Sequence, residues 1–257
     1  MTKEQNKALV LKAHQMLFSD KDVKALDLYF SPDFIEHSPL VANGISGLKE
    51  LVAEHPQMNY TVNRVLGDEN GLVALHGRFT GLDENPLVGF DIYRVKDGRI
   101  VEHWDGLVSE ASKNASGRSQ LDGTTEIGSQ ENTEKNRQLV QKFFKETLID
   151  GDYDGFRRYS DGHTFYQHSP DIADGVDEVI QFLEALKGKG EALKYDKTHR
   201  TIADGQFVLT HSEGSIAGTR HAYFELWRVE NGHIVELWDA ITPVPKDNEA
   251  LHHYGIF

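Results

Sequence analysis

The chain has 257 residues, and its 27 basic and 41 acidic side chains give a formal net charge of −14. A surface this acidic repels phosphate backbones, so nucleic acid is not an expected partner. Cysteine is absent, which excludes disulfides, thiolate zinc sites and cysteine nucleophiles together.

The first predicted elements in chain order are helices. Leu9, Val10, Ala13 and Leu17 recur at helical spacing after a capping-box pattern that begins at Thr2. A short second helix is expected over 23–30, and a third over 48–52, after the loop "EHSP". Alternation of apolar and polar residues then predicts strands in "YTVNRVLGD", "GLVALHGRF", "VGFDIYRV" and "GRIVEHWD".

The second half of the chain repeats this order of elements. "FIEHSPLVANG" resembles "FYQHSPDIADG", and "FDIYRVKDGRIVEHWD" matches "FELWRVENGHIVELWD". Two copies of one α+β domain are therefore predicted, with helices packed on one face of an antiparallel sheet. We expect a first domain over 1–110, a linker over 111–132 and a second domain over 133–257 that ends in a C-terminal tail.

Polar residues gather on one face of the predicted sheet in the first copy. Side chains two apart on a strand share a face, so Asp91 lies with Tyr93 and His103 lies with Asp105. We expect His76 on the same face, because buried polar groups need partners. Together these residues predict a pocket.

A loop histidine, His37, is expected to close over the mouth of this pocket. Pro39 ends the helical path beyond it. The second copy is expected to assemble the equivalent groups, with Leu237 in place of His103: His168, His211, Glu225 and Asp239, with Tyr166 nearby.

The "HSP…G" segment, the terminal "G-x-IVE-x-WD" strand and the tail "WDAITPVP" ending in "GIF" resemble the SnoaL-like (polyketide cyclase-like) group of the NTF2-like superfamily. Tandem members described as SnoaL-like, aldol-condensation-catalysing proteins are the most similar, over essentially the whole chain. The resemblance implies two cones, each a strongly bent, mainly antiparallel sheet wrapped by N-terminal helices. In the cyclase branch an aspartate near the pocket floor acts as acid and base, and the resemblance places this role on Asp105 or Asp239.

An aldol or cyclase step needs a base to remove a proton α to a carbonyl and a donor for the enolate oxygen. We expect a lyase, isomerase or cyclase that needs no cofactor and acts on a small apolar or carbonyl-containing molecule. The expected catalytic residues are Asp105, His37, His103, Asp239 and His168. The expected pocket residues are His76, Asp91, Tyr93, Tyr166, His211 and Glu225.

Other interpretations stay open at this point. The protein is alternatively a non-catalytic binder of small molecules, since apolar walls with few polar groups suit either role. A metal set of His103, Asp105 and either His37 or His76 is conceivable, although we expect no metal. His37 and His168 alternatively hold their turns by bonding to backbone, and His76 alternatively pairs with Asp91 across strands. If one half is catalytic, we expect it to be the half that contains His103.

The expected location is the cytoplasm, with no membrane partner. No stretch approaches the roughly 20 apolar residues that span a bilayer, and the charged N-terminus lacks a signal-peptide core. Separate NTF2-like domains commonly dimerise through their sheets, so we expect the two cones to form an intramolecular pseudo-dimer. The chain itself is expected to be capable of forming a homodimer.

Overall fold

The computed structural model describes residues 1–39, 41–162, 164–246 and 248–257. It divides into two compact units, one formed by residues 1–110 with 244–257 and the other by residues 111–243. These boundaries differ from the expected ones. The expected linker belongs to the second unit, where Asn114 hydrogen-bonds to the Gln167 carbonyl, and the tail belongs to the first, where Gly255 accepts a hydrogen bond from His37.

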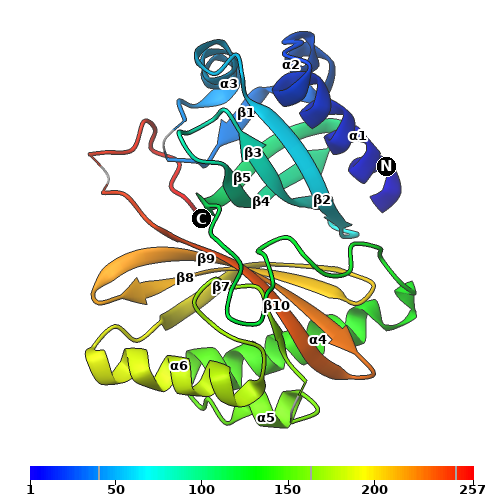
Figure 1. Ribbon diagram of the computed structural model, residues 1–257. Helices are drawn as coiled ribbons and strands as arrows, with labels where there is room; N and C mark the ends of the chain where they lie inside the picture. Colours follow the sequence, from blue (N-terminus) through cyan, green and yellow to red (C-terminus); the bar gives the residue numbers. More distant parts are fainter. Residues whose placement is uncertain (40, 163, 247) are drawn as a thin grey trace. The chain divides into compact units, whose positions relative to one another are not determined.

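The first unit packs three helices on one face of a five-stranded sheet (Figure 1). Its sheet has the order β1-β5-β4-β3-β2, in which β1 runs parallel to β5 and the other pairs are antiparallel. In chain order its elements are α1 (Lys3–His14), the π-helical turn η1 (Gln15–Ser19), α2 (Lys24–Tyr29), β1 (Phe30–Glu36), α3 (Gly44–Glu54), β2 (Asn59–Gly67), β3 (Leu72–Thr80), β4 (Leu87–Lys96) and β5 (Arg99–Ser109).

The second unit repeats this topology. Its sheet has the order β6-β10-β9-β8-β7, with β6 parallel to β10 and the other pairs antiparallel. Its elements are the 3-10 turn η2 (Gln130–Asn132), α4 (Thr133–Phe143), the π-helical turn η3 (Phe144–Ile149), α5 (Gly155–Tyr159), β6 (Tyr166–Gln167), α6 (Val176–Lys189), β7 (Lys194–Asp204), β8 (Phe207–Ile216), β9 (Thr219–Glu230) and β10 (His233–Pro243). The prediction of tandem α+β units with mainly antiparallel sheets wrapped by helices is confirmed.

Local sequence signals account for several of these boundaries. Helix α1 begins with the expected capping box, in which Thr2 and Gln5 each satisfy the other's backbone N–H. The hairpin between β4 and β5 turns at Asp97 and Gly98, both with positive φ (51° and 74°), as a tight two-residue hairpin requires. Strands β1 and β6 were not expected: the second helix was predicted to reach residue 30, and the structure has residues 30–36 in strand β1.

The core of the first unit lies between the helices and the concave face of the sheet. Val10 and Leu17 from the helical side pack with Val73, Leu75 and Tyr93 from the strands. Burying this apolar surface stabilises the fold by about 25 cal/mol per Å². The concave face is therefore apolar where it meets the helices. Polar residues on this face are unusual for a surface that faces the core.

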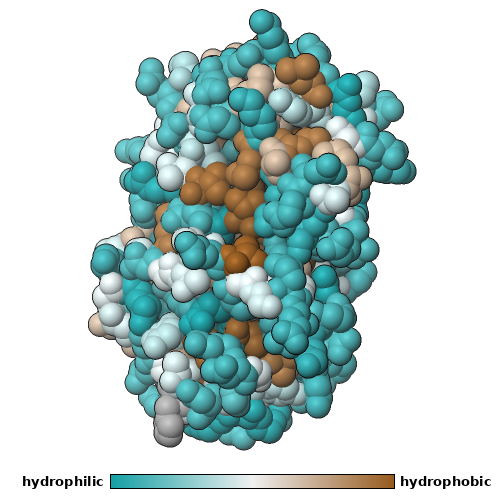
Figure 2. Space-filling view, turned by 90° about the vertical axis from the view of Figure 1, so that its right-hand side faces the viewer, coloured by the Kyte–Doolittle hydropathy of each residue, from teal (hydrophilic) through white to brown (hydrophobic). Residues whose placement is uncertain are grey.

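The face of the molecule drawn in Figure 2 is mainly hydrophilic. In Figure 2 hydrophobic residues reach the surface only in limited patches among hydrophilic ones, in keeping with the net charge of −14. Among the helices of the described residues, none combines the length and apolar character that crossing a membrane requires.

Candidate functional site

Four of the predicted site residues of the first unit lie together on the concave face. Asp91 on β4 is directly opposite Asp105 on β5, and Tyr93 is opposite His103. Opposite residues of an antiparallel pair share a face, so these side chains form one cluster. The rings of Tyr93 and His103 stack, with centroids 4.5 Å apart.

The sequence analysis missed a fifth member of this cluster, Glu36. It ends β1, which pairs in parallel with β5 and brings Glu36 beside His103. His103 Nδ1 lies 2.8 Å from Glu36 Oε1, and Nε2 lies 3.2 Å from Asp91 Oδ1. Burial lowers the pKa of His103, but the two carboxylates outweigh it and hold that pKa well above 6.5. His103 is therefore an imidazolium at neutral pH, with both ring nitrogens occupied.

Asp105 is the carboxylate of this cluster that solvent reaches. Along β5, exposure on this face rises from buried His103 through partly buried Asp105 and Leu107 to exposed Ser109. Desolvation raises the pKa of Asp105 to about 7. His103 opposes the rise, Glu36 and Asp91 add to it, and a hydrogen bond with Ser38 lowers it. A carboxylate with a pKa near neutrality is suited to accept a proton.

Two uncharged polar side chains lie close to these carboxylates, Tyr93 of the cluster and His14 of helix α1. Tyr93 is 2% exposed, and its hydroxyl has no hydrogen-bond partner among the described residues. Burial, followed by the nearby carboxylates, raises the pKa of Tyr93 well above 10, so its hydroxyl keeps its proton. His14, 5.9 Å from Tyr93 between ring centroids, has its pKa lowered to about 4, mainly by burial, and is neutral.

His37 does not face this cluster, which corrects the expectation that it closes the pocket. Its ring stacks on Trp104 with centroids 4.7 Å apart and planes at 13°, and Trp104 lies on the opposite face of β5 from His103. His37 Nδ1 donates to the Gly255 carbonyl over 2.8 Å. The structure therefore gives His37 the backbone-bonding arrangement of the alternative interpretation.

His76 is also misplaced in the prediction. It is opposite Phe90, whereas Asp91 is opposite Leu75, so His76 and Asp91 point to different faces. His76 instead stacks on Phe90 and contacts Arg64 Nη1 through Nδ1 at 3.1 Å. The conceivable metal set is therefore not assembled, because His37 and His76 both lie away from His103 and Asp105. Within the described residues no histidine and carboxylate cluster has an arrangement suited to a metal ion.

The second unit pairs two carboxylates at the equivalent place. Glu225 is directly opposite Asp239, and the Tyr195 hydroxyl donates to Glu225 Oε1 over 2.7 Å. Desolvation raises the pKa of Glu225 to about 8, opposed by Tyr195 and reinforced by Asp239. Desolvation also raises the pKa of Asp239 to about 7, with a further contribution from Asp171.

The remaining polar groups of the first cluster have no counterpart in the second unit. Leu237 and Gln167, paired across β10 and β6, stand where His103 and Glu36 pair in the first unit. Trp227 takes the place of Tyr93, and its Nε1 is satisfied by Thr210 Oγ1 at 3.1 Å. The second concave face thus keeps its carboxylates but has no counterpart of His103 or Tyr93, although the buried Tyr223 hydroxyl on the same face also has no partner among the described residues.

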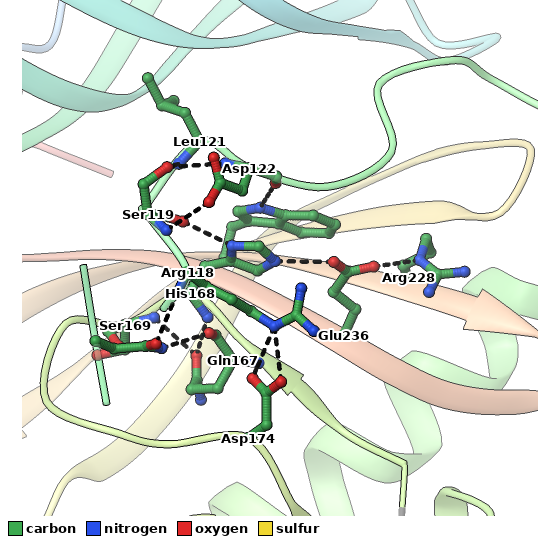
Figure 3. Close-up of polar contacts among 12 residues, drawn as sticks. Arg118, Ser119, Leu121, Asp122, Gln167, His168, Ser169, Asp174, Arg228 and Glu236 are labelled. Atoms are coloured by element: carbon green, nitrogen blue, oxygen red, sulfur yellow. Dashed lines mark hydrogen bonds and ion pairs between the residues drawn. The ribbon is translucent and has the colours of Figure 1, made fainter. Parts of the chain in front are cut away.

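The other predicted residues of the second unit lie off its concave face. His211 is opposite Phe224 and not Glu225, so it points to the other side of the sheet. His168 stacks on Trp238 with centroids 4.6 Å apart and contacts Glu236 Oε1 at 2.8 Å (Figure 3). Tyr166 pairs with Glu236 on this outer side, where Arg118 covers its ring at 4.3 Å.

Part of the first unit matches one known protein family. Residues 11–103 match the family model described as SnoaL-like domain. A comparison with curated proteins finds no match.

Among solved structures, a Kribbella flavida protein described as a "putative ketosteroid isomerase" is 24% identical, with 49% of this chain and 93% of that chain covered and a TM-score of 0.38. TsrD from Streptomyces laurentii is 17% identical, with 42% and 90% covered and a TM-score of 0.36. An NTF2-like protein of unknown function from Mesorhizobium loti is 19% identical, with 42% and 93% covered and a TM-score of 0.36.

Proposed function

We propose that the first unit, whose residues 11–103 match the SnoaL-like domain model, is an acid–base enzyme acting on a small carbonyl compound. The proposed chemistry is enolate formation, as in an isomerase, a cyclase or an aldol-type lyase. The observation that carries this proposal is Asp105, a solvent-reachable carboxylate on the concave face with a pKa of about 7.

Asp105 is the proposed general base. Its carboxylate removes the proton α to the carbonyl, and the electron pair of the broken C–H bond moves into the enolate, leaving negative charge on the carbonyl oxygen. The proton then returns to a different carbon in an isomerisation, or the enolate carbon attacks a second carbonyl in a cyclisation or aldol step. A base with a pKa near the working pH gives efficient proton transfer in both directions.

Tyr93 is the proposed donor to the enolate oxygen. Its hydroxyl is buried, keeps its proton and has no partner among the described residues, so it is free to donate when charge develops. His103 acts differently, because both of its ring nitrogens contact carboxylates. It supplies a fixed positive charge beside Asp105 rather than a transferable proton.

For the second unit we propose small-molecule binding without turnover. Trp227 and Leu237 replace Tyr93 and His103, which makes this part of its concave face more apolar and removes the hydroxyl and the positive charge beside the carboxylates. Apolar walls with a few polar groups are what a binding site requires. This proposal matches the expectation that any catalytic half is the one that contains His103.

Hydrogen–deuterium exchange at the α-carbon of a panel of small ketones tests the proposal. The wild-type protein should catalyse this exchange, and Asp105→Asn should reduce it by about 10²- to 10⁴-fold, the usual contribution of a general base. The matched variant Asp239→Asn should retain the wild-type rate. Equal rates for wild type and Asp105→Asn across the panel would refute the assignment of the base.

A further inference from the structure

The loop that follows β1 is held by a segment from the far end of the chain. His252 Nε2 donates to the Ser38 carbonyl over 2.7 Å, and His37 Nδ1 donates to the Gly255 carbonyl over 2.8 Å. The backbone N–H of Leu251 donates to the Pro39 carbonyl over 2.9 Å. We call residues 251–255 the first strap.

The loop under this strap contacts the carboxylates of the proposed active site. The Ser38 amide donates to Glu36 Oε1 over 2.9 Å, the same oxygen that contacts His103 Nδ1. Ser38 also lies near Asp105 and lowers the pKa of that carboxyl. Hydrogen bonds therefore run without a break from His252 through Ser38 to Glu36.

The second unit contains the same arrangement, built from an unrelated sequence. Its strap is residues 114–122, which we call the second strap. His168 Nδ1 donates to the Ser119 carbonyl over 2.7 Å, as His37 does to Gly255 (Figure 3). Asn114 Nδ2 donates mainly to the Gln167 and Ile172 carbonyls, at 2.7 and 2.9 Å, and makes a longer contact of 3.4 Å with the Ser169 carbonyl, the counterpart of the Ser38 carbonyl that His252 binds.

The two straps make similar hydrogen bonds although their sequences differ. This similarity argues that the hydrogen bonds between strap and loop are important. "LHHYG" and "NASGRSQLD" have no common pattern, yet each gives one side-chain N–H to a serine carbonyl and one backbone carbonyl to a loop histidine. In both units the serine amide then donates over 2.9 Å to the residue that ends β1 or β6, Glu36 or Gln167. A chance contact of a chain terminus would not be expected to reproduce this pattern.

We propose that His252 is a positioning residue: it fixes the Ser38 loop against Glu36 and Asp105, so that the last residues of the chain set the geometry of the first unit's carboxylates. His252 is 8% exposed and its donor nitrogen contacts the Ser38 carbonyl, whereas the adjacent His253 is exposed. The consequence for turnover rests on the proposed function, but the positioning does not.

The experiment uses the full-length protein and three variants: His252→Ala, His252→Gln and His253→Ala. Glutamine places an amide N–H near the position of the imidazole Nε2–H, so it tests the hydrogen bond rather than the ring. The first measurement is the NMR exchange rate of the Ser38 amide. The second is the carboxyl titration of Asp105, followed by its ¹³C shift. Neither needs a substrate.

His252→Ala should accelerate exchange of the Ser38 amide at least tenfold and move the Asp105 titration to higher pH, because the Ser38 hydrogen bond to the carboxylate weakens. His252→Gln should restore most of both values, and His253→Ala should match the wild type. Protection of β4 and β5 amides in every variant shows that the unit is folded. Unchanged Ser38 exchange and Asp105 titration in His252→Ala would overturn the proposal.

The two proposals fail in distinguishable ways. If His252→Ala shifts the Asp105 titration while the wild type exchanges no ketone, the positioning role of His252 is supported and the proposed enzymatic function is refuted. If the wild type exchanges ketones and His252→Ala leaves both NMR values unchanged, only the positioning role of His252 is refuted. When both hold, His252→Ala should lower kcat more than it raises KM, because it displaces the base and not the substrate's binding surface.

Discussion

His103 Nδ1 lies 2.8 Å from Glu36 Oε1 in the first unit, while the second unit pairs Leu237 with Gln167 at the same place in the fold. One copy thus keeps an ion pair where the other keeps an aliphatic side chain and an amide. Buried ion pairs cost desolvation free energy that apolar substitutes avoid. The second unit therefore serves as a natural template for variants of the first.

Replacing His103 alone should destabilise the first unit. His103→Leu leaves Glu36 and Asp91 buried without their cation, which costs about 3–5 kcal/mol. The double variant Glu36→Gln with His103→Leu reproduces the pairing of the second unit and should recover at least half of that loss. Native-state hydrogen exchange of β4 and β5 amides measures the free energy of unfolding for this unit. A double variant less stable than the single one would contradict the prediction.

The contribution of His103 should depend on pH in a defined direction. Its pKa in the folded state lies well above 6.5, so its stabilisation is fully present below pH 6.5 and is lost as pH rises through the folded-state pKa. The stability difference between wild type and His103→Leu should therefore shrink on going from pH 6 into the alkaline range. Unfolding measurements at several pH values check this, and a difference that grows with pH would contradict it.

Asp105→Asn should make the first unit more stable at pH 8 even as it removes the proposed base. Burial raises the pKa of Asp105 from 3.8 to about 7 in the folded state, so its stabilising contribution is fully present below about pH 4 and is lost as pH rises through 7. After discounting for its partial exposure, we expect a gain of about 1–3 kcal/mol at pH 8 and none at pH 4. The exposed Asp33 of β1, changed to Asn, is the control and should show no such gain.

The proposed activity should follow the ionisation of Asp105. The kcat/KM for ketone exchange should fall about tenfold per unit below pH 7 and level off above it, because only the carboxylate accepts a proton. Ser38→Ala removes the hydrogen bond that lowers this pKa, so its midpoint should lie at higher pH. A pH-independent rate between pH 5 and 8 would exclude Asp105 as the base.

The same substitution at two glutamates on opposite faces of the second sheet should change the stability of the second unit by different amounts. Glu225 has a pKa of about 8 and is largely protonated at pH 7, so Glu225→Gln keeps a neutral side chain and an acceptor for Tyr195. We expect it to change stability by less than about 1 kcal/mol. Glu236→Gln removes a charge that contacts His168 and Arg228, and should cost about 2–4 kcal/mol. Urea unfolding at pH 7 compares the free energies of unfolding of the two variants.

Strand alternation predicted the first cluster in large part. It placed Asp91 with Tyr93 and His103 with Asp105, and the structure pairs them across β4 and β5 as one group. Alternation within a strand does not fix the register between strands, however, and a shift of one residue moves a side chain to the other face. His76 was assigned to the wrong face for that reason.

Glu36 and the straps depend on contacts that local pattern does not encode. Strand β1 was not predicted, because the expected helix ended at residue 30 and residues 31–36 had no assigned element, so the carboxylate next to His37 in "FIEHSP" had no predicted face. Each strap pairs with a loop far away in sequence, through single hydrogen bonds to backbone carbonyls.

The pseudo-dimer, the homodimer and the cytoplasmic location remain predictions.

The first strap also sets an order of maturation during synthesis. Residues 1–110 emerge from the ribosome first, yet the Ser38 loop receives its strap only when residues 251–255 have been made. Domains generally fold as they emerge, so the second unit obtains its own strap from chain that precedes it. The half that is translated first is therefore completed last, and released chains truncated after residue 243 should contain a finished second site and an unfinished first one.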